Sequence, residues 1–363
     1  MNDRLGRFGR QELTAAATLL TVVCGCFSMD EAAFYRDGNV RHFATAASLL
    51  FAWLLLEIAV RRLRGMGADS LGGLLRRLPA FLSLPVSLLL FGALLLAAAL
   101  PTARFLRALS SFIYIEATPA ALLVYLWPCA ALLALFGMET LTRTARVLLP
   151  LVLLAALTGL ASDAPYYRAY RLFPLWPDGH VWLRQSVVSL LRFVPTVLML
   201  LATARGAQGW KNVLSAGRRG LWLGGLVTLT AEVCLGLCYR YTELRSLSAP
   251  LFRLLIEIEA DNASVRLDRV VLFVWTMADV YAASLAVYAA ELLTAEAQGV
   301  RDVRPLAALG AGLAMATALL LCEAERRGTG ALPLLYRFGW AAALLPLLAG
   351  LAAGQRRNKP CGA

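Results

Sequence analysis

The stretch that decides the fold is residues 13–29, LTAAATLLTVVCGCFSM. It is apolar enough to enter a membrane as a helix, yet Gly25 stands between Cys24 and Cys26, and a glycine costs a helix about 1 kcal/mol relative to alanine. Residues 185–203, QSVVSLLRFVPTVLMLLAT, form a second apolar segment with an interruption, because Pro195 lacks the amide proton that a helix interior needs. Paired interruptions in two halves of a chain are typical of transporter-type binding sites at the bilayer midplane.

The composition indicates a membrane protein. Of the 363 residues, 60% are hydrophobic and 16% are charged, and the mean hydropathy is +0.67. Apolar runs of about 20 residues, the length that crosses a hydrocarbon core of about 30 Å, recur along the chain. We therefore expect one integral membrane domain over residues 1–363. The first span is too long for the core of a signal peptide, so we expect it to stay in the mature protein.

The apolar runs predict ten membrane-spanning helices in an all-α polytopic fold. Five spans precede and five follow the loop of residues 162–184, which gives two halves of opposite orientation, as in a 5+5 inverted repeat. The repeat is inferred from the number of spans and the positions of the interruptions in the first and sixth helices. The predicted spans are about 11–29, 41–60, 81–101, 118–138, 145–161, 185–204, 219–239, 268–293, 304–322 and 333–353.

The distribution of charge predicts the orientation. With the N-terminus inside, the inner segments carry 19 basic and 6 acidic residues, and the outer segments carry 15 and 13. Basic residues concentrate on the cytoplasmic side of membrane proteins, so we expect both termini in the cytoplasm. The formal charge of +12 is explained by this topology and by contact with anionic lipid headgroups, and it indicates no nucleic-acid partner.

Five formal charges fall within the predicted spans: Glu57, Arg192, Glu232, Asp279 and Glu291. A charge in the membrane interior costs about 2.5–3.5 kcal/mol on insertion scales, so each needs a partner or a route to water. Glu57 and Glu291 are near span ends and are expected to reach the interface. Asp279 is near the middle of its span. Arg192, beside the second interruption, could neutralise Asp279 or the carboxylate of a ligand, either in a polar cavity or as a buried structural pair.

The interrupted helices suggest how a ligand would be held. Backbone groups freed at the interruptions could bind a small zwitterion, with half-helix N-termini favouring its carboxylate and half-helix C-termini its amine. Phe193 and Tyr281 could close the cavity, although a lone aromatic side chain in a membrane helix more often serves packing. The candidate ligand-binding residues are Cys24, Gly25, Cys26, Arg192, Phe193, Asp279 and Tyr281.

No motif indicates an enzyme, a metal site or a cofactor. The chain has no phosphate-binding glycine loop, no H-E-x-x-H and no G-x-S-x-G. His42 and His180 are the only histidines and lie far along the chain from the cysteine pairs, so the sequence predicts no zinc or iron site. Most of the seven cysteines lie in apolar runs, where cysteine behaves as a small hydrophobic residue.

Two connections are longer than a turn requires. Residues 61–80 are basic and contain glycine, and we expect them to form an amphipathic stretch at the inner surface. Residues 240–267 place leucine and isoleucine at spacings of three and four, which suggests a helix that lies on the outer membrane surface or caps the bundle. An outer loop that only covers helix ends is the alternative.

Several stretches of the chain share the pattern of one known protein family. They occur in the family's order over nearly the whole chain. They are Thr118-Pro119 with the following GMETLTR of residues 137–143, RLFPLWPDG of residues 171–179, SAPLFRLL of residues 248–255, and Arg266, Leu267, Asp268 and Trp275. Within residues 137–143, Glu139 and Arg143 are four residues apart and can form an ion pair at a helix end. Together, these stretches resemble the B-type, permease-like subunits of spore germinant receptors.

The resemblance implies a fold of the amino acid–polyamine–organocation superfamily, akin to the leucine transporter. It also implies a place in the inner membrane of bacterial spores, beside an A-type subunit and a C-type lipoprotein, and a role in sensing nutrients such as amino acids to trigger germination. The family's sixth span often carries a glycine–glutamate pair, where this chain has RFVPT at residues 192–196. Three hypotheses follow: a receptor subunit, an autonomous amino acid permease, and a scaffold whose site is vestigial.

Overall fold

The computed structural model describes residues 8–27, 29, 41–173, 191–244, 249–257, 267–300, 303–326 and 347–348, and their regular structure is helical throughout. Short 3-10 helices occupy Ala164–Tyr166, Ala169–Leu172 and Ala204–Ala207. The α-helices are α1 (Arg10–Cys26), α3 (Arg41–Gly65), α4 (Leu71–Arg76), α5 (Ala80–Phe112), α6 (Pro119–Leu135), α7 (Met138–Ser162), α9 (Val194–Ala202), α10 (Trp210–Cys238), α11 (Tyr241–Leu244), α12 (Pro250–Glu257), α13 (Leu267–Gln298) and α14 (Arg304–Arg326).

Six of the described helices are long and apolar enough to cross a membrane, and they make the chain an integral membrane protein. They are α3, α5, α7, α10, α13 and α14, and each coincides with a predicted span. The apolar helix α6 is shorter, at 17 residues. The tenth predicted span, 333–353, lies outside the described residues apart from 347–348, so the count of ten spans and the inverted repeat stay predictions.

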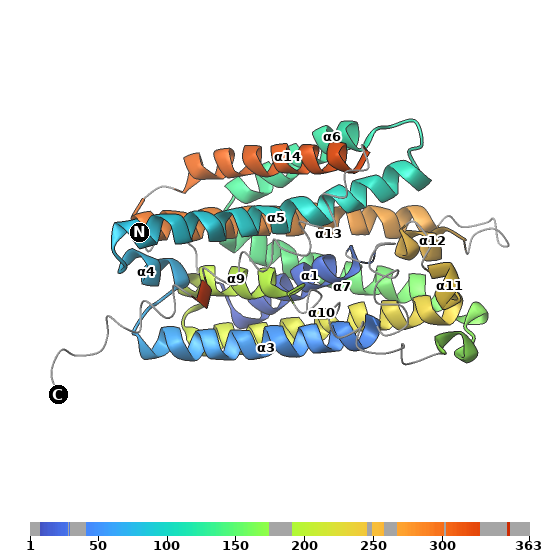
Figure 1. The fold of residues 1–363 in the computed structure, drawn as a ribbon, viewed down its shortest axis with the longest axis horizontal. Coiled ribbons are helices and arrows are strands. Elements are labelled where there is room, and N and C mark those ends of the chain that lie inside the picture. The colour runs from blue at the N-terminus through green and yellow to red at the C-terminus, as the bar shows by residue number, and fades with distance from the viewer. Residues whose placement is uncertain are drawn as a thin grey trace.

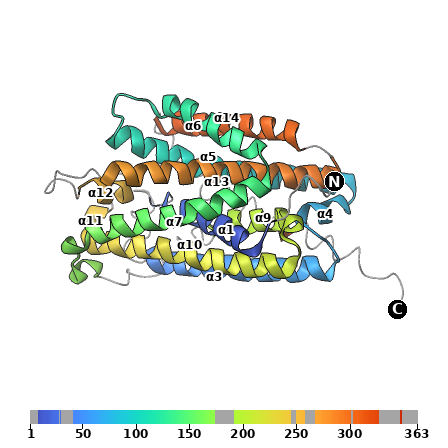
Figure 2. The same ribbon diagram turned by 180° about the vertical axis from the view of Figure 1, so that it is seen from behind.

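The long helices run in layers along the long axis of the molecule (Figures 1 and 2). At one side α3 lies beside α10, at the other side α6 lies beside α14, and α13 runs between the layers. Helix α13 contacts α1, α4, α5, α6, α7, α9 and α14, which makes it the central helix of the described part. Any side chain that α13 buries is therefore placed among several neighbouring helices at once.

Helix α1 is enclosed by protein and lies closest to α10. All its residues from Ala15 to Cys26 are buried. The contact is close because α10 presents glycines: a Cβ atom at Gly220 would lie 2.5 Å from the Cβ of Ala17, and one at Gly224 would lie 2.8 Å from the carbonyl oxygen of Thr18. Small residues let the backbones of membrane helices approach in this way, and the packing fixes the height of α1 in the bundle.

The turn between α6 and α7 departs from the predicted boundaries. Helix α6 ends at Leu135, and α7 begins at Met138, seven residues before the predicted start of the fifth span. Gly137 makes the turn with a φ of +87°, a conformation that glycine adopts without steric cost. The predicted ion pair of Glu139 and Arg143 is confirmed and lies in the first two turns of α7.

Both long connections contain short helices that pack on the bundle. In the basic connection, α4 buries Leu71, Leu74 and Leu75 and packs against α13, while Arg76 is exposed, which confirms the amphipathic stretch. In the other connection, α12 buries Leu251, Phe252 and Leu254. Helices α11 and α12 lie at the end of the molecule opposite α4 (Figure 1), so the described part of this connection caps the bundle.

The packing of α1 against α10 predicts that two glycine-to-alanine substitutions differ in their effect on the stability of the protein. Gly224→Ala places a methyl group against the backbone of α1 and is expected to destabilise the protein by about 1–3 kcal/mol. Gly312→Ala on α14, where no heavy atom lies within 4 Å of the added carbon, is expected to be neutral or stabilising by up to about 1 kcal/mol. Melting temperatures of the purified variants measure both effects, and an equal effect at both positions would contradict the close contact.

Candidate functional site

The two interrupted segments meet inside the bundle. Helix α1 ends at Cys26, and α9 begins at Val194 after a turn at residues 191–193. The hydroxyl oxygens of Thr21 and Thr196 lie 3.3 Å apart, within hydrogen-bond distance, which joins the two helices. Pro195 is at the beginning of α9, where a helix needs no amide proton from it, so this proline starts a helix. Residues 185–190, the earlier part of the sixth predicted span, lie outside the described residues.

A buried carboxylate fixes the beginning of α9. Glu232 of α10 accepts hydrogen bonds through Oε1 from Nε of Arg41 at 2.9 Å and from Nη1 of Arg192 at 3.0 Å. The hydroxyl of Thr45 lies between them: it donates to the same oxygen at 2.9 Å and accepts from Nη1 of Arg192 at 2.8 Å. All four side chains are buried. Because charge-assisted bonds are strong in a low-dielectric interior, this polar cluster holds α3, α10 and the start of α9 together.

The structure contradicts the alternative in which Arg192 and Asp279 form a buried structural pair. Arg192 pairs with Glu232. Asp279 is 1% exposed, and neither of its carboxylate oxygens has a hydrogen-bond partner in the described part of the chain. The sequence alone indicates no partner for Glu232, and Arg41 stands at the start of a predicted span. The available signal was that Arg41 and Thr45 are four residues apart and therefore share a helix face.

Asp279 lies at the level where α1 ends. Its polar neighbour on α5 is Thr102, but the hydroxyl proton of Thr102 goes to the carbonyl oxygen of Ala98 at 2.9 Å. Cys24 is within electrostatic reach of both Asp279 and Arg192. The structure thus brings three of the predicted site residues, Cys24, Arg192 and Asp279, into one region of the bundle.

The other predicted site residues have varied surroundings. Phe193 is completely buried, and the guanidinium carbon of Arg192 lies 5.9 Å from its ring centroid. Tyr281 is 1% exposed, and its hydroxyl has no hydrogen-bond partner among the described residues. Gly25 faces α10: a Cβ atom there would lie 2.7 Å from Cγ2 of Thr228 and closer still to the hydroxyl. Cys26 also approaches Thr228, so these two residues lie on the α10 side of α1.

Aromatic side chains form a cluster about one helical turn from Asp279, on the side of α12. Phe27 stacks on Phe105 with ring centroids 4.8 Å apart, and it lies 5.5 Å from Trp275. Phe252 of α12 is 5.5 Å from Phe105 and 6.2 Å from Phe27. Trp275 is one turn before Asp279 on α13, as Phe105 is one turn after Thr102 on α5. This aromatic cluster therefore lies on the α12 side of the Asp279 level.

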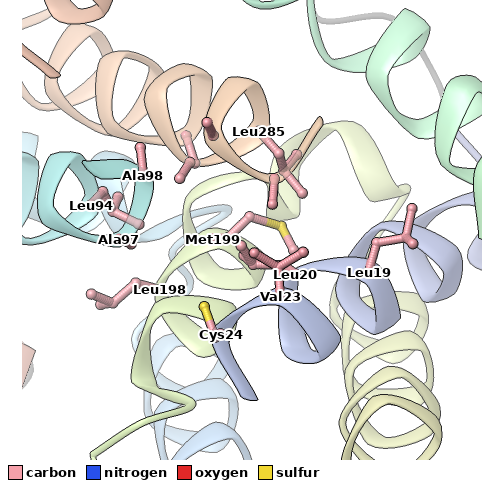
Figure 3. Close-up of a cluster of buried hydrophobic side chains, with 14 of the residues drawn as sticks. Leu19, Leu20, Val23, Cys24, Leu94, Ala97, Ala98, Leu198, Met199 and Leu285 are labelled. Atoms are coloured by element: carbon pink, nitrogen blue, oxygen red, sulfur yellow. The ribbon is translucent and has the colours of Figure 1, made fainter. Parts of the chain in front are cut away.

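Aliphatic side chains fill the side of the Asp279 level that lies opposite the aromatic cluster. Figure 3 shows Leu20 and Val23 of α1 beside Met199 of α9, below Leu285 of α13, whereas Leu198 of α9 points to the side where Ala97 and Ala98 of α5 lie. All of them are buried. The three helices α1, α5 and α13 show the same order when followed from the end nearest α12. An aromatic residue comes first, then Cys24, Thr102 or Asp279, and then residues of this aliphatic cluster. A buried carboxyl group is thus enclosed between two apolar layers.

The two carboxylates expected near the interface differ from one another. Glu57 is bonded to Arg218 of α10, and Nε of Arg61 is 3.8 Å away, which agrees with a structural role near the helix end. Glu291 does not reach the interface as predicted, because α13 continues to Gln298 and the residue is 0% exposed. Among the described residues, no group of three or more His, Cys, Asp or Glu side chains could hold a metal ion.

Comparison with known protein families identifies the family of the chain. The family model described as "Spore germination protein" (spore permease) matches residues 47–321, most of the chain. The chain belongs to the spore germination protein family. No curated protein matches it significantly.

Solved structures show the fold of this spore germination protein. A Na⁺-coupled sialic acid symporter superposes with a TM-score of 0.63 at 14% identity, covering 95% of this chain and 80% of the symporter. A manganese transporter of Eremococcus coleocola superposes with a TM-score of 0.60 at 14% identity, covering 95% and 78%. These neighbours are transporters of the leucine-transporter type. At such low identity they establish the fold alone, and this fold agrees with the transporter-type fold that the resemblance implied.

The polar cluster predicts a large effect of removing its one carboxylate. Glu232→Gln leaves the guanidinium groups of Arg41 and Arg192 without their shared anion, and breaking a buried ion pair in this way is expected to cost about 3–5 kcal/mol. Thr45→Val removes a neutral hydroxyl and is expected to cost about 1 kcal/mol.

The matched control is Glu139→Gln, which removes the partly exposed pair with Arg143 and is expected to cost no more than about 0.5 kcal/mol. Melting temperature and the folded fraction after purification give the order of the three variants. A Glu232→Gln variant as stable as Glu139→Gln would contradict the assigned role of the cluster.

Proposed function

We propose that this spore germination protein is the permease-like subunit of a germinant receptor and binds a small nutrient, an amino acid, beside Asp279. The observation that carries the proposal is the buried carboxyl group of Asp279, which has no hydrogen-bond partner among the described residues and lies where α1 ends. The proposal includes the ten-helix inverted repeat with broken first and sixth helices, both termini in the cytoplasm, and a place in the spore inner membrane.

The amino group of an amino acid fits the charge of this site. A carboxylate inside a membrane protein costs about 2.5–3.5 kcal/mol unless it is paired, and an ammonium group supplies a positive charge with three hydrogen-bond donors. The C-terminal end of α1 adds partial negative charge, which also favours the amine. The ammonium would therefore lie between Asp279 and the carbonyl groups near Cys24, Gly25 and Cys26.

The carboxylate of the ligand would face the beginning of α9. A helix N-terminus carries partial positive charge and unbonded amide protons, and Val194 is the first residue of α9. Arg192 contributes positive charge nearby while it remains bonded to Glu232. Phe193, which is buried beside Arg192, would limit the size of the ligand side chain. Tyr281 is also buried, but it follows Asp279 by two residues and leaves α13 on a different face, so it would act through packing.

Binding would act on the arrangement of helices. A ligand between α1, α9 and α13 contacts elements that meet only there, so it stabilises the conformation in which they are close. The aromatic cluster, to which α12 contributes Phe252, would close over the ligand. The A-type subunit and the C-type lipoprotein would carry the resulting change to the rest of the receptor.

An autonomous amino acid permease is the second candidate, since the structural neighbours are transporters. The two candidates differ in genetic context and in uptake. Genes for A- and C-type subunits beside this one favour the receptor, and accumulation of labelled amino acid in liposomes that contain only this protein favours the permease. The vestigial-site hypothesis predicts no small-molecule binding at all.

Ligand screening by thermal shift tests the site. The purified protein is expected to be stabilised by an amino acid within a panel of amino acids, nucleosides and sugars, by about 2.7 kcal/mol when the ligand is at a hundred times its dissociation constant. Asp279→Asn is expected to fold and to lose this stabilisation, whereas the control Glu139→Gln keeps it. Equal stabilisation of the Asp279→Asn variant would show that the ligand binds elsewhere. A flat panel would favour a scaffold, or a subunit that binds only within its complex.

Spore germination tests the receptor role. Spores that carry Asp279→Asn are expected to lose the response to the nutrient of this receptor and to keep the response to germinants of other receptors. The rate of loss of refractility reports germination, and immunoblotting of spore membranes shows whether the variant is present at normal abundance. A normal response to the nutrient would contradict the proposed role of Asp279.

A further inference from the structure

Glu291 of α13 is a second carboxyl group that the protein encloses completely. Its exposure is 0%, and neither oxygen has a hydrogen-bond partner in the part of the chain that the structure describes. It follows Asp279 by 12 residues, which corresponds to about 18 Å along a helix, so it lies well away from the proposed ligand site. The inference that follows does not depend on the proposed function.

The carboxyl group of Glu291 lies directly against the backbone of α14. A Cβ atom at Gly310 would lie 3.1 Å from Cγ and 3.2 Å from Cδ of Glu291, and closer still to Oε1. A glycine inside a helix costs about 1 kcal/mol relative to alanine. Gly310 thus makes room for the carboxyl group at the contact of the two helices, whereas Gly312 of the same helix has no heavy atom near it.

No described charge compensates Glu291. On its own helix, Tyr288 is within electrostatic reach of both Glu291 and Glu296, and Glu296 is bonded to Ser70. None of the titratable groups described on the helices packed against α13 forms an ion pair or hydrogen bond with Glu291. The titratable groups on these neighbouring helices are Arg10, Glu12, Cys24 and Cys26 on α1, Arg76 on α4, Arg104 and Arg107 on α5, Tyr125 and Cys129 on α6, Glu139, Arg143 and Arg146 on α7, and Cys322 and Glu323 on α14.

An ionised carboxylate is not compatible with this enclosure. Burying an unpaired charge among apolar groups is costly, while a protonated carboxylic acid is neutral and costs far less. The close contact of α13 and α14 therefore requires a proton on Glu291, and separation of the helices would admit water and release that proton. By linkage, the proton and the contact stabilise each other.

Helix α14 lies where such a movement is feasible. It is at the edge of the bundle beside α6 (Figures 1 and 2), and Leu309, Leu313 and Leu320 on its outer face are exposed. We propose that Glu291 is a proton-binding site of the α13–α14 contact, which carries a proton while the helices are packed and releases it when α14 moves away from α13. The ligand of this site is a proton, and the site couples the pH to the position of α14.

Hydrogen–deuterium exchange of α14 as a function of pH tests the proposal. In the purified full-length protein, the exchange of peptides from α14, corrected for the intrinsic pH dependence of amide exchange, is expected to accelerate up to about tenfold per pH unit as the proton is lost. Glu291→Gln, a neutral mimic of the protonated acid, is expected to fold and to remove this acceleration. Glu139→Gln, on the exposed pair with Arg143, is expected to behave like the wild type.

Three results would overturn the proposal: pH-independent corrected exchange of α14 in the wild type, an unchanged pH dependence in Glu291→Gln, or failure of Glu291→Gln to fold. A second set of variants checks the geometry. Gly310→Ala is expected to lower the melting temperature, and Glu291→Ala in the same chain is expected to restore part of it by removing the collision. No recovery in the double variant would contradict the contact on which the proposal rests.

Discussion

The structure depends on one carboxylate. Glu232 binds both Arg41 and Arg192, and Thr45 completes the cluster. These residues come from α3, from α10 and from the turn before α9, so one buried ionic contact decides where α9 begins. Since Thr21 of α1 meets Thr196 of α9, the same contact also determines which part of α9 the end of α1 faces. Close packing of α1 on the glycines of α10 completes this arrangement.

The interior of the bundle contains buried carboxyl groups that have no basic partner among the described residues. Arg192 is committed to Glu232, while Asp279 and Glu291 lack hydrogen-bond partners among the described residues. Both belong to α13, the central helix, and Leu285 of the aliphatic cluster (Figure 3) lies between them along this helix. We infer two separate roles for them: Asp279 would bind the amine of a ligand, and Glu291 would bind a proton. A membrane protein that senses a nutrient requires a core with two conformations of similar free energy. A ligand or a proton that binds to a buried carboxyl group in only one of the two conformations shifts the equilibrium toward that conformation.

Sequence reasoning was most successful where the physical constraint is local. The membrane imposes a length on apolar helices, so α3, α5, α10 and α13 could be predicted from their runs of apolar residues. The ion pair of Glu139 and Arg143 follows from a spacing of four on a helix. The partner of Arg192 could not be predicted, because Thr45 and Glu232 are 147 and 40 residues away in the chain. Glu291 was misplaced because the prediction ended α13 at residue 293, and because nothing in the sequence shows that Gly310 faces it.

The central claim is that an amino acid binds where α1 and α9 meet α13. An electron cryomicroscopy structure of the protein with the amino acid that stabilises it tests this claim most directly. The account predicts density for the ligand between the two apolar layers, with its ammonium group within hydrogen-bond distance of the carboxylate of Asp279. Ligand density elsewhere, for example in the surface pocket lined by Tyr170 and Arg240, with the Asp279 level still filled by protein side chains, would contradict it.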